Sequence, residues 1–243
     1  MFTVLGAATV DFDNVSGVTS IISRGSSETL LVDDIQEIPT SISINNNTAV
    51  QTFVIKDTAV AGTTDSVTLN FDGVGGVVNV GGETDGDGDI ETFTIVASAG
   101  ASDLGVGNGF GADATTITVN ATSALDLGST AQFIASTNFD ASASTAAVTS
   151  VFAAKTIASE TAVTIKGGAG ADQFDIGTFT TAENFGDLTV DMGAGNDTLD
   201  LGAVADTDTG SSIKGGAGDG DILIISGAAI TAEVATQISE FEI

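Results

Sequence analysis

Short runs of alternating polar and apolar residues recur along much of the chain. The clearest are TSISI at 40–44, TFVIK at 52–56, SVTLNF at 66–71, VVNV at 77–80, ETFTIV at 91–96 and TTITVN at 115–120. A period of two places one side of each run against a core and the other side in solvent, as in a half-buried β-strand. Helical patterns are weak. A helical turn could form in 141–154 and in 231–241, but neither stretch has a clear cap and apolar stripe. The pattern predicts an all-β protein with many short strands.

An internal repeat follows in the C-terminal part of the chain. Three segments align, namely TIKGGAGADQFDI, TVDMGAGNDTLDL and SIKGGAGDGDILI, and the aspartates Asp172, Asp197 and Asp221 are 25 and then 24 residues apart. A period of this length with one glycine-rich turn per period is typical of a solenoid. The strands of successive coils then stack about 4.8 Å apart, and the turns lie along one edge. We therefore expect a right-handed parallel β-solenoid.

The residues around the turns support the alignment. Before the turn, Ile165, Val190 and Ile213 hold the same place, and after it we align Phe174, Leu199 and Ile222. The second copy has Met192 where the first glycine is expected, and the third copy has one extra residue near Gly220.

The repeat is clear only in part of the chain. We predict a less regular β-rich region at 1–150, either a solenoid or a β-sandwich, and a β-solenoid with glycine-aspartate turns at 151–243. NVGGETDGDGDIETF at 79–93 shares GG and GDGDI with the third turn and could be a fourth, degenerate copy.

The composition agrees with short strands joined by tight turns. The 243 residues include 31 glycines and one proline, and β-branched residues interrupted by glycine favour strands. Cysteine is absent, so no disulfide or thiolate metal site stabilises the fold. No stretch approaches the roughly 18 apolar residues of a membrane-spanning helix, so we expect no membrane insertion.

The charge is strongly negative. Asp and Glu total 33 and Lys and Arg total 5, which gives a net charge of -28. Nucleic acid is excluded as a partner, because phosphate binding needs clustered cations. Carboxylates at this density repel one another and destabilise the compact state. Two explanations are open: a high-salt environment screens the charges, or the chain binds specific cations.

The glycine-aspartate turns favour specific cations. Residues 167–175, GGAGADQFD, fit the G-G-x-G-x-D-x-U-x pattern of calcium-binding turns in parallel β-rolls. Ca²⁺ takes six to eight oxygen ligands from carboxylates and carbonyls, and glycine lets the backbone turn its carbonyls toward one point. An ion between two stacked turns would take ligands from both. The alternative is plain glycine turns in which aspartate serves only turn geometry.

We therefore predict that Ca²⁺ is held by the three turns. The candidate ligands are Gly167, Gly168, Ala169, Gly170 and Asp172 in the first turn, Asp191, Gly193, Gly195, Asn196 and Asp197 in the second, and Gly215, Gly216, Gly218, Asp219 and Asp221 in the third.

An acidic stretch in the first half is a further candidate. TDGDGDIE places Asp85, Asp87 and Asp89 at alternate positions, as at the start of an EF-hand loop. Ile90 stands where that loop requires glycine, and Val96 stands where it requires glutamate. The stretch is therefore not an EF-hand; it is either a solenoid-type calcium loop or a solvated acidic turn.

The composition argues against an enzyme. Histidine and cysteine are absent, which excludes Ser-His and Cys-His nucleophiles. A glycosidase can work with two carboxylates, but sugar sites commonly use Trp and Tyr as platforms, and both are absent. We expect no catalytic activity.

The three turns, one per coil, resemble those of bacterial repeat-in-toxin (RTX) proteins and, more narrowly, surface-layer (S-layer) proteins of that group. TNFDASAS at 137–144, followed by AVTIKGGAGADQF, is similar in style, and the resemblance covers residues 135–243. It implies a secreted cell-surface protein, exported in one step by a C-terminal signal missing from this fragment. MFTVLGAATV lacks the basic start of a signal peptide, which agrees with that route.

The resemblance also implies a function. Such a protein folds on meeting extracellular calcium and assembles with copies of itself into a two-dimensional lattice, with cell-surface polysaccharide as a further candidate partner. The alternative is a segment of an adhesin or of an extracellular matrix filament. Met192 and the extra residue near Gly220 depart from the family pattern, which puts full calcium occupancy of the second and third turns in question.

Overall fold

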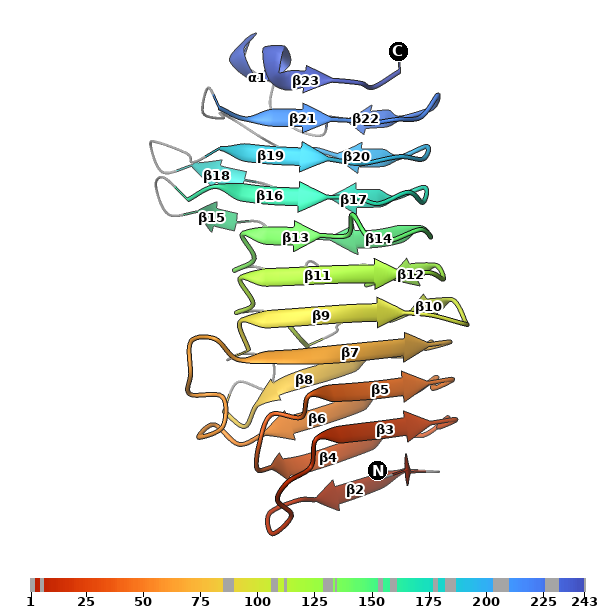
Figure 1. Cartoon of the computed structure of the whole chain (residues 1–243), viewed down its shortest axis with the longest axis vertical. Helices are drawn as coiled ribbons and strands as arrows, with labels where there is room; N and C mark the ends of the chain where they lie inside the picture. The colour runs from red at the N-terminus through yellow and green to blue at the C-terminus, as the bar shows by residue number, and fades with distance from the viewer. Residues whose placement is uncertain are drawn as a thin grey trace.

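The computed structural model describes residues 3–4, 7–84, 90–105, 109–111, 113–128, 133, 135–152, 155–157, 161–176, 179–181, 187–202, 210–225 and 232–242. Successive strands along the chain alternate between two faces and pair with strands of the neighbouring coils in parallel (Figure 1). The chain runs one way along the near face, returns along the far face and rises toward the C-terminus, which makes the coil right-handed. The predicted all-β parallel solenoid is confirmed.

One face is an 11-stranded parallel sheet, the long sheet. Its strands, in spatial order, are β1 (Thr3–Val4), β3 (Ser20–Arg24), β5 (Ser41–Asn45), β7 (Ser66–Asp72), β9 (Thr92–Ala97), β11 (Thr116–Ala121), β13 (Asn138–Asp140), β16 (Val163–Lys166), β19 (Leu188–Asp191), β21 (Ser212–Lys214) and β23 (Ile238–Ser239). The alternating runs of the sequence form these strands because their apolar side chains point inward; β9, for example, alternates half-buried and buried residues over its whole length.

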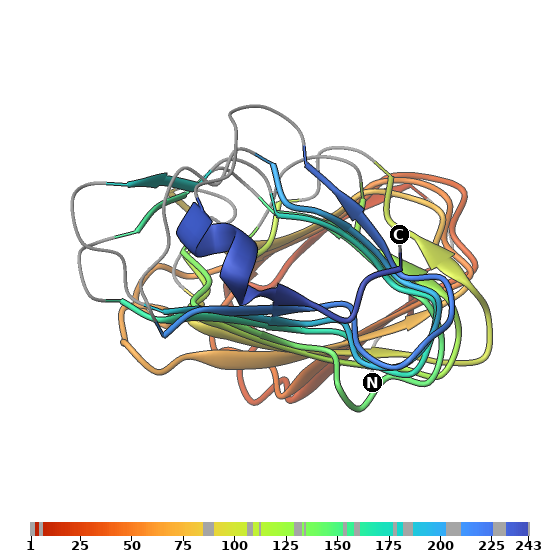
Figure 2. The same cartoon turned by 90° about the horizontal axis from the view of Figure 1, so that it is seen from above.

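The opposite face consists of shorter parallel sheets (Figure 2). A four-stranded sheet contains β2 (Ala8–Asp11), β4 (Leu30–Ile35), β6 (Gln51–Ile55) and β8 (Val78–Gly82). A six-stranded sheet contains β10 (Ser102–Asp103), β12 (Leu125–Asp126), β14 (Val148–Val151), β17 (Gln173–Asp175), β20 (Thr198–Asp200) and β22 (Ile222–Ile224). A pair is formed by β15 (Lys155–Ile157) and β18 (Phe179–Thr181).

The core between the faces is a set of stacked columns. Phe93, Ile117, Phe139, Ile165 and Val190 lie in register in consecutive strands of the long sheet and are all buried. Phe139 also lies against neighbouring rings, with centroid distances of 5.9 Å to Phe133, 4.9 Å to Phe152 and 5.5 Å to Phe174. The long sheet continues past residue 150 without a break in pairing, and the domain division proposed there stays a prediction.

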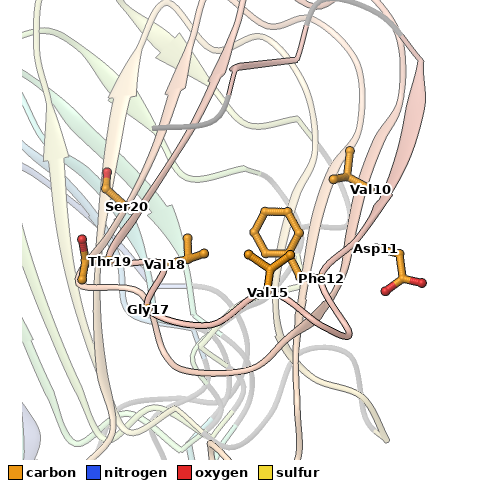
Figure 3. Close-up of a pocket in the computed structure, with 8 residues that line it drawn as sticks. All are labelled: Val10, Asp11, Phe12, Val15, Gly17, Val18, Thr19 and Ser20. Carbon is orange, nitrogen blue, oxygen red and sulfur yellow. The ribbon is translucent and has the colours of Figure 1, made fainter.

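The two ends of the core differ. A helix, α1 (Ala232–Gln237), lies at the C-terminal end, where its Val234 is buried. It is too short to cross a membrane, as is any helix within the described ranges. At the N-terminal end, a hollow of about 470 Å³ is lined by residues that include Val10, Phe12, Val15 and Val18 (Figure 3).

The structure corrects three expectations. The stretch 141–154 contains β14 and, in its described residues, no helix, whereas the helical turn expected in 231–241 is present as α1. Leu199 pairs with Leu223 and not with Ile222, because the extra residue of the third turn lies before this strand. Gly81 and Gly82 lie inside β8, which leads back to the long sheet, so residues 83–84 and 90–91 are on the edge opposite the glycine-aspartate turns.

Candidate metal-binding turns

The three glycine-aspartate turns stack in register. Lys166, Asp191 and Lys214 pair across the coils just before the turns, and a bridge joins Ala194 to Ala217 within them. After the turns, Gln173 pairs with Thr198 and Thr198 with Ile222. The predicted stacking of the three turns is therefore confirmed, except that Ile222 aligns with Thr198 and not with Leu199. The extra residue of the third turn lies between Ala217 and Ile222.

Asp172, Asp197 and Asp221 form a column inside the turns, which we call the aspartate column. Their exposed fractions are 2%, 0% and 1%. Each Oδ1 accepts a hydrogen bond from the backbone N–H one coil earlier: Asp172 from Val148 at 2.8 Å, Asp197 from Asp172 at 2.7 Å, and Asp221 from Asp197 at 2.9 Å. The side chains thus join coil to coil.

Earlier coils make the same connection with backbone. Ser102, Leu125 and Val148 occupy the column position before Asp172. There, the N–H of Ser102 donates to the carbonyl of Ala124, and the N–H of Leu125 donates to the carbonyl of Ala147, both at 2.9 Å. From Asp172 onward a carboxylate replaces the carbonyl as acceptor, so the ladder changes from neutral to anionic where the glycine-aspartate turns begin.

The second carboxylate oxygens differ between the turns. Asp172 Oδ2 accepts the N–H of Gly168 at 2.7 Å. Asp197 Oδ2 and Asp221 Oδ2 are buried and have no hydrogen-bond partner among the described residues. Burying an ionised oxygen without a partner is costly, so each of these two atoms favours a cation or a proton beside it.

The pKa values of the aspartates also indicate that a cation or a proton is favoured beside these oxygens. Burial, together with the neighbouring carboxylates of Asp172 and Asp221, raises the pKa of Asp197 from 3.8 to about 7, although the hydrogen bond from the N–H of Asp172 lowers it. Burial also raises the pKa of Asp172. Negative charge in the aspartate column is therefore unfavourable unless an opposite charge compensates it.

Glycine is required where the turns approach one another most closely. Gly193 and Gly216 have φ values of 94° and 102°, which residues with a side chain rarely adopt. A Cβ on Gly193 would lie 2.2 Å from the carbonyl oxygen of Gly168, and one on Gly216 would lie 2.1 Å from that of Gly193. The glycines thus bring a backbone carbonyl of one turn directly against the next turn.

Four other predicted ligands line a hollow at the second and third turns. Gly195, Asn196, Gly218 and Asp219, together with Ala217, line this open hollow of about 610 Å³. Asn196 and Asp219 are exposed there and could supply further oxygens. Gly167, Gly168, Ala169, Gly170 and Gly215 belong to the same stack of turns.

Two predicted features lie elsewhere. Asp191 is exposed at the end of β19, in register with Lys166 and Lys214, so it is separate from the aspartate column. The segment with Asp85, Asp87 and Asp89 lies outside the described residues. Met192 takes the place of the first glycine with its side chain fully buried in the core, and the turn keeps its stacking.

Sequence analysis missed a continuation of the column. Glu242 Oε2 accepts the N–H of Asp221 at 2.5 Å, as an aspartate does in the coils before. Its position 21 residues after Asp221 is close to the repeat, but no glycine turn of the repeat type precedes it, so the motif does not mark it.

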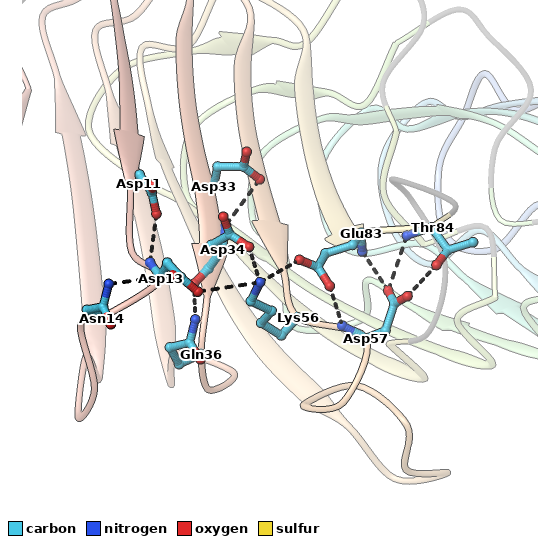
Figure 4. A network of polar contacts seen from close by, with 10 residues as sticks. All are labelled: Asp11, Asp13, Asn14, Asp33, Asp34, Gln36, Lys56, Asp57, Glu83 and Thr84. Carbon is cyan, nitrogen blue, oxygen red and sulfur yellow. Dashed lines mark hydrogen bonds and ion pairs between the residues drawn. The ribbon is translucent and has the colours of Figure 1, made fainter.

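A second acidic group, at the opposite edge, was also missed (Figure 4). Lys56 Nζ lies 2.9 Å from Glu83 and 3.9 Å from Asp13 and also pairs with Asp34. Hydrogen bonds with Asp34 and Glu83 raise the pKa of Lys56, and the same lysine lowers the pKa of Asp34. Here a lysine ammonium supplies positive charge, whereas the aspartate column forms no ion pair with a lysine or arginine among the described residues.

The residues present fit a bound Ca²⁺. No three acidic side chains of the described ranges converge on one point. An ion would therefore combine Oδ2 of Asp197 or Asp221 with backbone carbonyls of the stacked turns, which are oxygen ligands of the type that Ca²⁺ takes.

The chain matches no family model, no curated protein and no solved structure in a comparison with each.

Proposed function

We propose that this chain is a structural building block of a calcium-dependent bacterial surface layer or related cell-surface assembly. The observation that carries the proposal is the aspartate column, in which Asp197 and Asp221 each bury a carboxylate oxygen that has no partner among the described residues. A protein that positions such oxygens between stacked turns is stabilised by a cation that fills the place.

Calcium would act by linkage. Asp197 and Asp221 would hold the ion together with carbonyls of the glycine turns, and the bound ion supplies positive charge. Because the ligands come together only when the coils stack, Ca²⁺ binds the folded chain in preference to the unfolded one. A site at 100 times its Kd contributes about 2.7 kcal/mol. Two or more such sites would decide whether the C-terminal coils fold.

The shape and chemistry of the chain support a structural role. The stacked coils form an elongated body (Figure 1), and the chain has no histidine, cysteine, tyrosine or tryptophan for common catalytic or sugar-binding roles. Extracellular fluid, where calcium reaches millimolar levels, is the compartment in which weak calcium sites of this kind are filled. We propose secretion to the cell surface and neighbouring copies as the partners.

The test compares calcium with other ions. The chain is titrated with CaCl₂, MgCl₂ and NaCl from a chelated state, folding is followed by far-ultraviolet circular dichroism, and assembly is followed by negative-stain electron microscopy. We expect millimolar calcium to fold the C-terminal coils and to produce ordered sheets, while magnesium at the same concentration does neither.

Each other outcome has a defined meaning. Folding that needs only high NaCl would contradict the calcium proposal and support charge screening. Calcium-dependent folding without any assembly would contradict the surface-layer role, and glycan binding by the resulting monomer would then favour an adhesin segment.

A further inference from the structure

The outer face of the long sheet differs in charge from the rest of the chain. The chain contains only five basic residues and has a net charge of -28. The strands of the long sheet nevertheless carry three basic and three acidic side chains, all next to buried residues and therefore directed outward: Arg24, Lys166, Lys214, Asp72, Asp140 and Asp191. This face has no net charge, and the remainder of the chain carries the whole excess of carboxylates.

Four of these charges alternate in sign along one column, which we call the charge column. Asp140 is in register with Lys166, Lys166 with Asp191, and Asp191 with Lys214. Their strands β13, β16, β19 and β21 lie directly above one another on the near face (Figure 1). The column thus presents negative, positive, negative and positive charge at intervals of about 4.8 Å.

The charge column is not neutralised within one copy. All ion pairs among the described residues are those of Lys56, so none joins two members of the column. Oδ1 of Asp140 accepts the N–H of Ser142 at 2.9 Å, and Oδ1 of Asp191 accepts the N–H of Gly193 at 3.2 Å. These bonds hold the two carboxylates at the ends of their strands, where a charge from a partner can still pair with them.

The charge column is complementary to itself. Consider a second copy that faces the first across a two-fold axis, with the axis parallel to the strands and passing between β16 and β19. The order of the coils is then reversed in the partner. Asp140 lies opposite the partner's Lys214, and Lys166 lies opposite the partner's Asp191. By symmetry the other two members also meet opposite charges, so the contact contains four pairs of opposite sign.

Other face-to-face arrangements are less favourable. A shift by one coil sets Asp140 against the partner's Asp191 and Lys166 against the partner's Lys166. A shift by two coils keeps only two of the four pairs. An axis parallel to the solenoid places each charge against its own copy. The alternation of charge therefore selects one orientation and one register.

The side chains beside the charge column allow close approach. Asn138, Thr164, Thr189 and Ser212 lie in register on the same outer face, and all are short and uncharged. Two such faces can pack at about 10 Å, the usual distance between stacked sheets. The strands from β11 to β23 would face one another over about 29 Å, which is the size of a weak and reversible contact. Contact through this face also keeps the acidic surfaces of the two copies apart.

We infer that two copies of the chain dimerise through the outer face of the long sheet, with their solenoid axes antiparallel and their charge columns paired. The inference deepens the proposed function, on which it rests for the role of neighbouring copies. A two-fold contact closes on itself, so the edge of the glycine-aspartate turns stays free for other contacts within a layer.

The test uses two variants with reversed charge. Lys166→Asp and Asp191→Lys each place two like-charged pairs in the contact. Arg24→Asp is the matched control, because it makes the same change of charge on the same face at β3, outside the span from β11 to β23. Sedimentation velocity is measured in saturating calcium, below the protein concentration at which sheets appear by electron microscopy.

We expect wild type and Arg24→Asp to show the same equilibrium between monomer and dimer. Each charge-column variant alone should dimerise at least about tenfold more weakly. An equimolar mixture of the two should dimerise as wild type does, because a Lys166→Asp copy facing an Asp191→Lys copy again contains four opposite pairs. A monomeric wild type, single variants that dimerise normally, or a mixture that stays monomeric would overturn the inference.

Cross-linking tests the register. The chain has no cysteine, so Asn138→Cys and Ser212→Cys each provide a single thiol on the outer face. These two positions lie opposite each other in the inferred dimer, whereas each is three coils away from its own copy. A short bismaleimide should link the mixture of the two variants and neither variant alone. Linking of either variant to itself would contradict the antiparallel arrangement.

Failure of the dimer and failure of the proposed function are distinguishable. Circular dichroism of the same samples reports whether calcium folds the chain. Chains that fold with calcium and stay monomeric would refute the dimer alone. Dimers that form while the spectrum does not respond to calcium would refute the calcium proposal and support the contact through the charge column.

Discussion

Replacing Asp197 by asparagine should have opposite effects with and without calcium. Asparagine keeps an oxygen that can accept the N–H of Asp172, as Oδ1 does at 2.7 Å, but removes the buried charge. The rise in the pKa of Asp197 from 3.8 to about 7 corresponds to about 4 kcal/mol of destabilisation when the group is ionised in the folded chain. Asp197→Asn removes that cost.

The net gain is smaller, because the new amide group is buried. An unsatisfied amide costs about 1–3 kcal/mol, so we expect calcium-free Asp197→Asn to be about 1–3 kcal/mol more stable than wild type above pH 7. In saturating calcium the order should reverse, because the variant loses a ligand. One site at 100 times its Kd is worth about 2.7 kcal/mol.

Urea unfolding at pH 8, with chelator and with calcium, measures both effects. The control is Asp200→Asn, which removes the same charge from β20 at a half-buried position outside the aspartate column. Its unfolding free energy should change by less than about 0.5 kcal/mol in either condition. If Asp197→Asn destabilises the chain equally with and without calcium, the column is a hydrogen-bond ladder only and the reasoning is refuted.

Three further predictions concern the turns and the ladder. In urea unfolding, Gly216→Ala should destabilise the calcium-loaded chain by at least about 2 kcal/mol more than Gly25→Ala does. Both glycines have positive φ, but only at Gly216 would the new methyl group meet a backbone oxygen, at 2.1 Å. Equal losses of stability would contradict the close stacking of the turns. On chelation, hydrogen exchange should accelerate in 163–176 and 188–200 but not in 41–72. In that earlier part the neutral side chain of Asn47 accepts the N–H of Ser26, and Lys56 neutralises acidic side chains at the opposite edge. Uniform acceleration would contradict a boundary at Asp172. Without calcium, the stability that Asp197 contributes is present below about pH 4, the range of its pKa in the unfolded chain, and is lost as pH rises through about 7, its pKa in the folded chain. The stability difference between Asp197→Asn and wild type should therefore grow across this range in chelator, and a flat difference would contradict it.

The solenoid could be predicted because the alternation of polar and apolar residues and the spacing of the turns can both be recognised along the chain, without knowledge of tertiary contacts. The alternation of 66–71 and 91–96 follows directly from strands with one buried side, and β7 and β9 confirm it. The repeat of 24–25 residues then fixed the stacking of the three turns. The first half has no comparable spacing, since its strands differ in length, so whether it was a solenoid or a sandwich stayed open.

The burial of the aspartates could not be predicted from their motif. The pattern marks Asp172, Asp197 and Asp221 as ligands, but it does not show that their Oδ1 atoms take the place of the backbone carbonyls that accept the N–H groups of Ser102 and Leu125 in earlier coils. That relation joins residues in different coils and depends on three-dimensional register. The same limit explains the misplacement of Ile222, since one extra residue can be assigned to either side of an aspartate.

The role of Lys56 was equally invisible in the sequence. Asp13, Asp34 and Glu83 are far apart along the chain and meet Lys56 only because successive coils bring the same edge together. The N-terminal coils therefore carry their own counter-charge. This gives the calcium proposal a definite spatial limit, with cation dependence beginning at the first glycine-aspartate turn.

The most direct test is a crystal structure grown in calcium, with anomalous diffraction data that identify the ion. The account predicts calcium between the stacked turns, with Oδ2 of Asp197 or Asp221 and backbone carbonyls among its ligands at about 2.3–2.6 Å. Turns that hold no ion at millimolar calcium, with Asp197 Oδ2 and Asp221 Oδ2 still buried without a partner, would contradict it.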